Sequence, residues 1–147
     1  MKITNEMRIK NRNTWSRRLA FQAIYSWSIN NSDLDDLISS YSKDENYVKS
    51  NNDYFNEIVF GVINNISAID KSIDKISDID ISNINFIELS ILRCFIFELG
   101  YNKKFPNEVL ISESVKLATK FGGQDSYKFV NAFLDSFVKK GLHEKNN

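Results

Sequence analysis

The sequence predicts an all-α fold, because its apolar residues recur in steps of three and four and no strand pattern competes with them. The clearest stripe consists of Phe55, Ile58, Val59, Val62, Ile66, Ile69, Ile73 and Ile76. This spacing places apolar side chains on one face of a helix. No run alternates apolar and polar residues, and no hairpin turn is present. We therefore predict two packed three-helix bundles that join near residue 80 and form one compact unit.

The first 13 residues are expected to form a flexible basic arm. The arm carries four cations against one acid, namely Lys2, Arg8, Lys10 and Arg12 against Glu6. The N-terminal bundle, residues 14–80, then starts with a helix over residues 14–30. The apolar face of this helix consists of Leu19, Ala23, Ile24 and Trp27.

Two further helices complete the N-terminal bundle. The polar run at residues 30–33 predicts a break and a new N-cap, since short polar side chains favour turns and helix starts. A short helix then directs Leu34, Leu37 and Ile38 inward, and the polar residues 42–51 form a loop. The third helix follows the stripe to Ile76. Its β-branched residues lower helix propensity, so packing must stabilise it.

The C-terminal bundle, residues 81–140, is expected to hold three helices before a tail of residues 141–147. These helices are predicted over residues 83–101, 106–121 and 125–140. Gly100 or Asn102 ends the first, and Pro106 suits the first turn of the second. In the last helix we expect Phe133 and Phe137 in the core.

A Gly-Gly corner between the last two helices is the most informative feature. Gly122 and Gly123 are expected to end a helix in the left-handed conformation that Gly tolerates, with Asp125 or Ser126 capping the next. The corner is flanked by Lys120, Phe121, Lys128 and Phe129. Alternating charge and rings suit single-stranded nucleic acid, which is both anionic and stackable. The alternative is a plain helix corner whose Phe residues are core.

Composition excludes several function classes. Nineteen basic residues balance nineteen acidic ones, so any nucleic-acid contact must come from a local patch. His143, near the C-terminus, is the single histidine, which disfavours a His-based catalytic triad. The single Cys94 excludes a multi-cysteine metal site and is expected to be a buried hydrophobe. No phosphate loop or dinucleotide fingerprint is present. We expect no catalysis, no cofactor and no metal.

The chain also lacks the signals of export or membrane insertion. Its first twenty residues are polar and basic without an apolar run, unlike a signal peptide. The most apolar helix is interrupted by Glu88, Arg93 and Glu98, so it is not expected to span a membrane. Arg93 is expected to be structural, with its stem covering apolar surface and its guanidinium paired with an acid. With a single cysteine, these features predict a cytoplasmic protein.

Five collinear segments resemble the NusB family. They are residues 17–27 (RRLAFQAIYSW), 54–62 (YFNEIVFGV), 88–99 (ELSILRCFIFEL), 106–109 (PNEV) and 120–131 (KFGGQDSYKFVN). Together they cover roughly residues 14–138, in order and with fitting spacings. Each segment alone is a weak signal, but five in order are specific.

The resemblance implies a non-enzymatic, RNA-binding transcription antitermination factor. NusB proteins pair with NusE, a protein of the small ribosomal subunit, and bind the boxA element of ribosomal RNA transcripts within the transcription elongation complex. The residues implied to contact RNA are Arg8, Lys10, Arg12, Arg17, Arg18, Phe121, Lys128 and Phe129. Those implied to contact a partner are Tyr25, Glu88, Asn107 and Asp125. A homodimer of the free protein is also possible within the family.

The chain departs from the family at the start of its first helix. Relatives often carry a dense arginine run there, whereas Asn13, Thr14, Trp15 and Ser16 precede Arg17 here. Positive charge is displaced into the arm, and Trp15 offers stacking in place of charge. Two alternatives therefore stay open: a protein-interaction module with little RNA affinity, and an accessory domain related to those of RNA cytosine methyltransferases. The RNA-binding hypothesis requires the N-terminal cations and the Gly-Gly corner to converge in one open groove.

Overall fold

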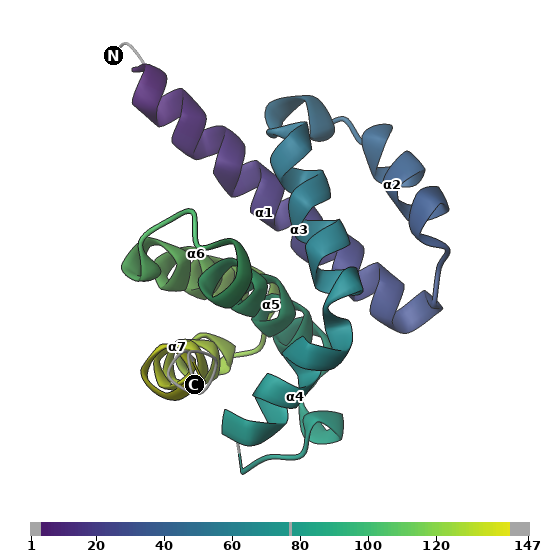
Figure 1. The fold of residues 1–147 in the computed structure, drawn as a ribbon. Helices are drawn as coiled ribbons and strands as arrows, with labels where there is room; N and C mark the ends of the chain where they lie inside the picture. The colour runs from purple at the N-terminus through teal and green to yellow at the C-terminus, as the bar shows by residue number, and fades with distance from the viewer. Residues whose placement is uncertain (1–3, 77, 142–147) are drawn as a thin grey trace.

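A computed structural model describes residues 4–76 and 78–141, and these residues form helices without any strand, which confirms the all-α prediction. The helices are α1 (Asn5–Asn30), α2 (Leu34–Ser42), α3 (Asn52–Asn64), α4 (Ile66–Ile76), α5 (Phe86–Phe97), α6 (Asn107–Phe121) and α7 (Ser126–Ser136) (Figure 1). The connecting or extending turns are the 3-10 turns η1 (Tyr47–Lys49) and η2 (Ile81–Asn83) and the π-helical turns η3 (Glu98–Asn102) and η4 (Phe137–Gly141). Lys2 and His143 lie outside the described residues.

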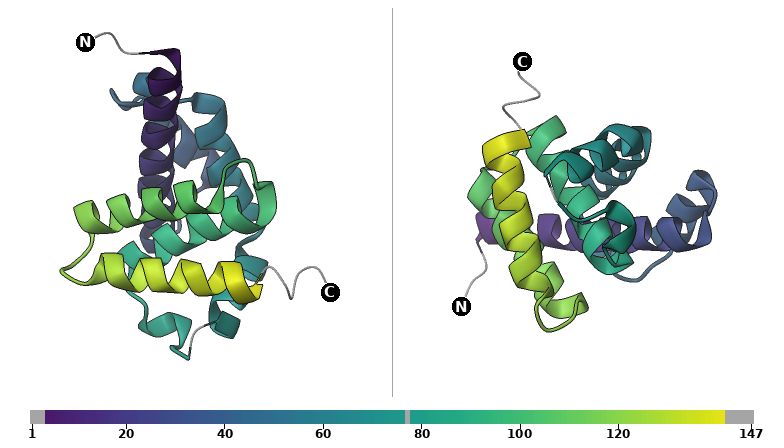
Figure 2. Two further views of the ribbon diagram at one scale, coloured as in Figure 1. Left: turned by 90° about the vertical axis from the view of Figure 1, so that its left-hand side faces the viewer. Right: turned by 90° about the horizontal axis from the view of Figure 1, so that it is seen from below.

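Helix α1 begins well before the position that the sequence pattern indicated. Residues 5–13, expected as a flexible arm, are helical, and the side chain of Thr4 caps the helix by accepting a hydrogen bond from the Met7 N–H at 3.1 Å. Residues 4–12 are exposed, and the first turns project beyond α5, α6 and α7 (Figures 1 and 2). The helix ends as expected, at Asn31 in the left-handed conformation. Cations on this segment therefore have fixed directions around a helix axis.

The apolar stripe from Phe55 to Ile76 is divided between two helices. Asn65 leaves the helical conformation, and its side-chain amide donates a hydrogen bond to the Gly61 carbonyl at 2.8 Å. An Asn side chain that bonds locally to the backbone competes with the helix in this way. The stripe itself is buried, with Phe55 and Ile73 fully inaccessible. Helix α4 contacts α3 and also α5, the first helix of the predicted C-terminal bundle.

Helix α5 lies at the centre of the fold and contacts α1, α3, α4, α6 and α7. It is apolar on nearly all sides, which is typical of a helix buried all round. Helices α6 and α7 run antiparallel beside it (Figure 2). One hydrophobic cluster extends from α1 to η4 and includes Phe133 and Phe137, as expected. The boundary near residue 80 stays a prediction.

The side chains of Arg93 and Cys94 are structural, as their positions in the sequence indicated. The Arg93 guanidinium donates to both carboxylate oxygens of Asp70, at 3.0 and 2.9 Å, and to the Ser28 hydroxyl at 2.9 Å. It thereby links α5 to α4 and α1. Cys94 is 2% exposed, and burial raises the pKa of its thiol.

A buried ionic cluster around Arg17 joins α1 to three other elements. The guanidinium donates to Glu98 at 3.2 Å, to Glu113 at 3.1 Å and to the Tyr54 hydroxyl at 3.0 Å. The rings of Tyr54 and Phe105 lie 5.3 and 4.7 Å from its central carbon. Arg17 is 4% exposed and Glu98 is fully buried. The cluster therefore fixes α1 against α3, η3 and α6.

Among the described residues Arg17 is the cation that contacts Glu98, whereas Glu113 also contacts Lys116 at 3.6 Å and the Thr14 hydroxyl at 2.6 Å, so Glu98 is the carboxylate on which a proton is favoured. Burial raises the pKa of Glu98 to about 7; Arg17 lowers it and the neighbouring Glu113 raises it further. A buried carboxylic acid that ionises near neutral pH makes the stability of the fold depend on pH.

Glu98→Gln is expected to remove a pH dependence of stability. Between the ordinary pKa of 4.5 and the raised value of about 7, the folded state holds a proton that the unfolded state releases. The wild-type free energy of unfolding should therefore fall as pH rises through this window, by up to about 3 kcal/mol, and then level off. Urea unfolding at about pH 5 and pH 8 measures this. Wild-type and variant curves that stay parallel would contradict it.

Gly61→Ala is expected to destabilise the fold by roughly 1–3 kcal/mol, because it overpacks the core. A Cβ at residue 61 would clash with the Phe97 ring. This ring is 6% exposed and is stacked on Tyr101, with ring centres 6.0 Å apart. The matched control is Gly123→Ala, whose Cβ would meet only the Ser126 hydroxyl at 3.9 Å. Thermal unfolding of both variants tests this; equal melting temperatures would refute the packing argument.

Candidate nucleic-acid interface

The Gly-Gly corner joins α6 to α7 without the left-handed backbone that the sequence suggested. Gly122 has an extended conformation (φ −88°, ψ −174°), and none of the described glycines has a positive φ. Gly122 is required at this position because the corner has no room for a Cβ atom. A Cβ at Gly122 would lie 2.5 Å from the Ser126 Cβ and 2.7 Å from the Ala118 carbonyl oxygen. The prediction of a left-handed cap is therefore wrong, although the tight corner is present.

Ser126 holds the corner against α5. Its hydroxyl accepts a hydrogen bond from the Gly123 N–H at 2.9 Å and donates one to the Glu88 carboxylate at 2.7 Å. Asp125 occupies the N-cap position of α7, but its side chain makes no capping hydrogen bond. The expected cap by Asp125 or Ser126 is thus replaced by a bond across the corner.

Arg17 cannot serve as the RNA contact that the resemblance implied. Its guanidinium is 96% buried and already donates to Glu98, Glu113 and Tyr54. Presenting it to a phosphate would leave Glu98 buried without its cation and would remove one of the partners of Glu113, a cost of several kcal/mol. The prediction for this residue is wrong, because its partners lie far away in the sequence.

Arg18, in contrast, lies at the surface beside the corner. Its guanidinium carbon is 4.8 Å from the Trp15 ring centre and 5.1 Å from that of Phe121. Phe121 is half-buried and packs on Phe21 at 5.3 Å, so its ring is packed on one side and contacts a cation on the other. The structure therefore brings Arg18 and the Gly-Gly corner together.

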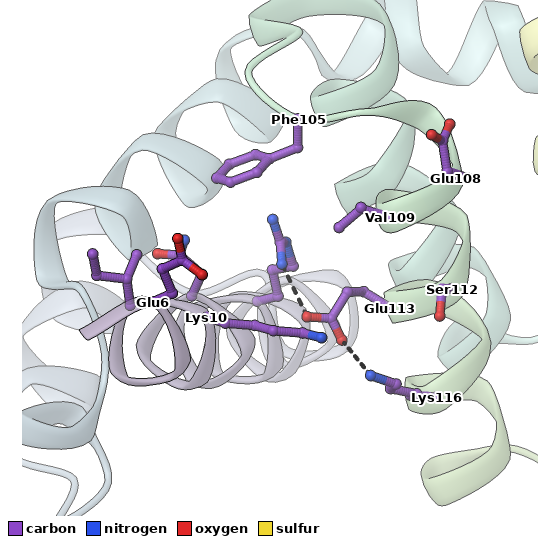
Figure 3. A pocket seen from close by; sticks show the side chains of 11 residues that line it. Glu6, Lys10, Phe105, Glu108, Val109, Ser112, Glu113 and Lys116 are labelled. Carbon is purple, nitrogen blue, oxygen red and sulfur yellow. Dashed lines mark hydrogen bonds and ion pairs between the residues drawn. The ribbon is translucent and has the colours of Figure 1, made fainter. Parts of the chain in front are cut away.

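The cations at the start of α1 lie on different sides of the helix. Lys10 lines a cleft of about 490 Å³ between α1 and α6, where it extends toward Glu113 and Lys116 (Figure 3). Arg8 and Arg12 are each two residues from Lys10 along α1, a rotation of about 200°, so they lie on the other side of the helix and do not line this cleft. Arg12 donates to the Ser50 carbonyl at 3.2 Å. Lys10 does not share a face with Arg8 and Arg12.

On α7, Lys128 and Phe129 occupy the first turn after the corner. Lys128 has 67% of its side chain exposed and pairs with Asp125 at 3.6 Å. Phe129 is half-buried against Phe133, with ring centres 5.9 Å apart. Its ring lines a hollow of about 420 Å³ together with Glu88.

The residues assigned to a partner fall into two places. Tyr25 and Phe121 line a hollow of about 370 Å³, whose wall includes Ile87. Glu88 and Asp125 line the other hollow, of about 420 Å³. Asn107, at the first residue of α6, is about 21 Å along the helix from Phe121. Gln22 and Ile87 also line the hollow beside Tyr25. They were not predicted as site residues, because their residue types carry no signal for binding.

Metal-binding groups and membrane-spanning helices are both absent from the part of the chain that the structure describes. Among residues 4–76 and 78–141, no group of three or more His, Cys, Asp or Glu side chains is placed to hold a metal ion. No helix within these ranges is long and apolar enough to cross a membrane.

Comparisons with known proteins show the family and the fold of this chain. The NusB family model matches residues 14–139. The transcription antitermination protein NusB of Treponema denticola is 40% identical over 127 residues, which cover 84% of this chain and 93% of that protein. A structure of T. maritima NusB matches with a TM-score of 0.74 at 25% identity, over 95% of this chain and 94% of the other.

A further solved structure shares the fold. A crystal structure of the antitermination factors NusB and NusE in complex with dsRNA matches with a TM-score of 0.79 at 24% identity, over 86% of this chain and 95% of that one. The family match and the curated relative together decide the assignment: this chain belongs to the NusB family of transcription antitermination factors, which are not enzymes.

Proposed function

We propose that this protein binds boxA-type single-stranded RNA of ribosomal RNA transcripts together with the ribosomal protein NusE. The observation that carries the proposal is the contact between Arg18 and Phe121, which brings a cation of α1 to the Gly-Gly corner. A structurally similar NusB has been crystallised with NusE and dsRNA, which supports NusE and RNA as partners for this chain. In the transcription elongation complex the bound pair would help the polymerase resist termination.

The proposed RNA contacts form a corner surface, which we define as Arg18, Phe121, Lys128 and Phe129. Its cations attract phosphates, and its half-buried rings offer stacking surfaces for bases. Arg8 and Arg12 on the projecting turns of α1 extend the positive charge. Arg17 is excluded by burial, and Lys10 by its direction.

The two hollows lined by the residues assigned to a partner are the proposed NusE contact. Tyr25 lies in one and Glu88 and Asp125 in the other. The half-buried Tyr25 ring, the half-buried Glu88 carboxylate and the exposed Asp125 lie beside a basic surface, and such groups suit a protein partner with basic side chains that binds the same RNA. Asn107 is assigned to a separate contact at the far end of α6.

One observation favours a second function, a protein-interaction module with little RNA affinity of its own. The chain has no net charge, and burial removes Arg17 from the surface. Binding of the protein with NusE to boxA-like and scrambled RNA, at two salt concentrations, separates the two functions. Equal binding to both RNAs would remove sequence-specific recognition, and no binding with NusE present would favour the interaction module.

Lys128→Glu is expected to weaken RNA binding by the complex about tenfold and to reduce the salt dependence by roughly one phosphate contact. The melting temperature should stay unchanged, because Lys128 is exposed and contacts only Asp125 and the Tyr127 ring. Lys139→Glu is the matched control, since Lys139 is 71% exposed and also pairs with an acid on the same face. Equal affinity of wild type and Lys128→Glu would refute the corner surface as an RNA site.

A further inference from the structure

Trp15 lies in a row of rings and cations that reaches beyond the corner surface. The Lys49 ammonium is 5.2 Å from its ring centre, and the Arg18 guanidinium is 4.8 Å from it. Arg18 also contacts the Phe121 ring, and the Lys120 ammonium is 6.0 Å from that ring. The row therefore runs from η1 across α1 to the end of α6.

The cations of this row are not neutralised by acids. Within residues 4–76 and 78–141, the side chains of Arg18, Lys49 and Lys120 make no hydrogen bond and no ion pair. Their contacts are with rings, and an exposed cation–π pair is weak enough to exchange for another partner. The positive charge of the row thus stays available to an anion.

Arg12 adds a fourth cation at the outer end of the row. It precedes Trp15 by three residues and therefore lies on the same side of α1. Its guanidinium donates to the carbonyl of Ser50, the residue after Lys49. Arg12 and Lys49 thus both lie close to Trp15.

We propose that Trp15, Lys49 and Arg12 form a further nucleotide subsite on the RNA path, which we call the Trp15 subsite. A base stacks on the half-buried Trp15 ring in place of the Lys49 ammonium, and the displaced ammonium and Arg12 bind the adjoining phosphate. Because Arg18 stays between the rings of Trp15 and Phe121, the two rings take different bases. The inference rests on the proposed function.

The chemistry of the subsite sets its specificity. Every base has a π face, so stacking on Trp15 should accept any nucleotide. The Trp15 subsite should therefore strengthen binding of boxA-like and scrambled single-stranded RNA by the same factor, and sequence preference should arise elsewhere.

Fluorescence tests the stacking directly. In a Trp27→Phe background Trp15 is the single tryptophan, and Trp27 itself is a half-buried residue packed against the core. Adding either RNA to this variant with NusE should quench Trp15 emission as binding proceeds. Unchanged emission while labelled RNA shows binding by anisotropy would overturn the proposal.

Substitutions test the energetics. Trp15→Ala should weaken binding of both RNAs by roughly 5- to 150-fold with an unchanged salt dependence, and Trp15→Phe should retain most of the affinity. Lys49→Ala should reduce the salt dependence by about one phosphate contact. Lys43→Ala, an exposed lysine in the same connection, is the control.

The outcomes separate this inference from the proposed function. Wild-type affinity in both Trp15→Ala and Lys49→Ala would overturn the Trp15 subsite alone, provided that Lys128→Glu still weakens binding. A wild-type complex that binds no RNA would overturn both. If Trp15→Ala fails to fold, as judged by circular dichroism, the Lys49→Ala salt dependence and the fluorescence titration decide.

Discussion

The buried Arg17 guanidinium fixes the rotation of α1, and the location of the candidate interface depends on that rotation. An apolar face directs a helix toward the core, and directional hydrogen bonds restrict its rotation further. The Arg17 guanidinium donates hydrogen bonds to Tyr54, Glu98 and Glu113, which belong to three different elements. The next residue along a helix is turned by about 100°, so Arg18 faces Phe121 at the surface while Arg17 stays inside. The same cluster therefore buries one arginine and presents its neighbour.

This rotation also sorts the cations of the projecting turns. Lys10 faces the cleft between α1 and α6, where Glu113 and Lys116 already balance charge. Arg12 lies near Trp15 and Lys49 instead. Exposed charges act over about 10 Å at moderate salt, so their grouping matters more than their sum. A chain without net charge can therefore still present a local positive surface.

The sequence predicted the features that depend on local pattern, namely the all-α class, the core stripe, the breaks near residues 31 and 122, and the structural role of Arg93. It did not distinguish Arg17 from Arg18, because adjacent identical residues differ only through acids that lie 81 and 96 positions away. The break at Asn65 was missed because the apolar period continues across it. Gly122 was predicted for its backbone freedom, but the space taken by Ser126 and the Ala118 carbonyl explains it. Such long-range contacts have no signature in composition or spacing.

Two adjacent arginines thus have opposite electrostatic roles. Arg17 is surrounded by carboxylates, which compensate the cost of burying its charge and cancel its field at the surface. Arg18 is positioned by the rings of Trp15 and Phe121, which restrict its motion without removing its charge. An acid in place of either ring would hold the guanidinium more firmly but would compete with a phosphate for it. Rings rather than acids around a surface cation are therefore the arrangement that keeps a net-neutral protein able to bind an anionic, stackable ligand.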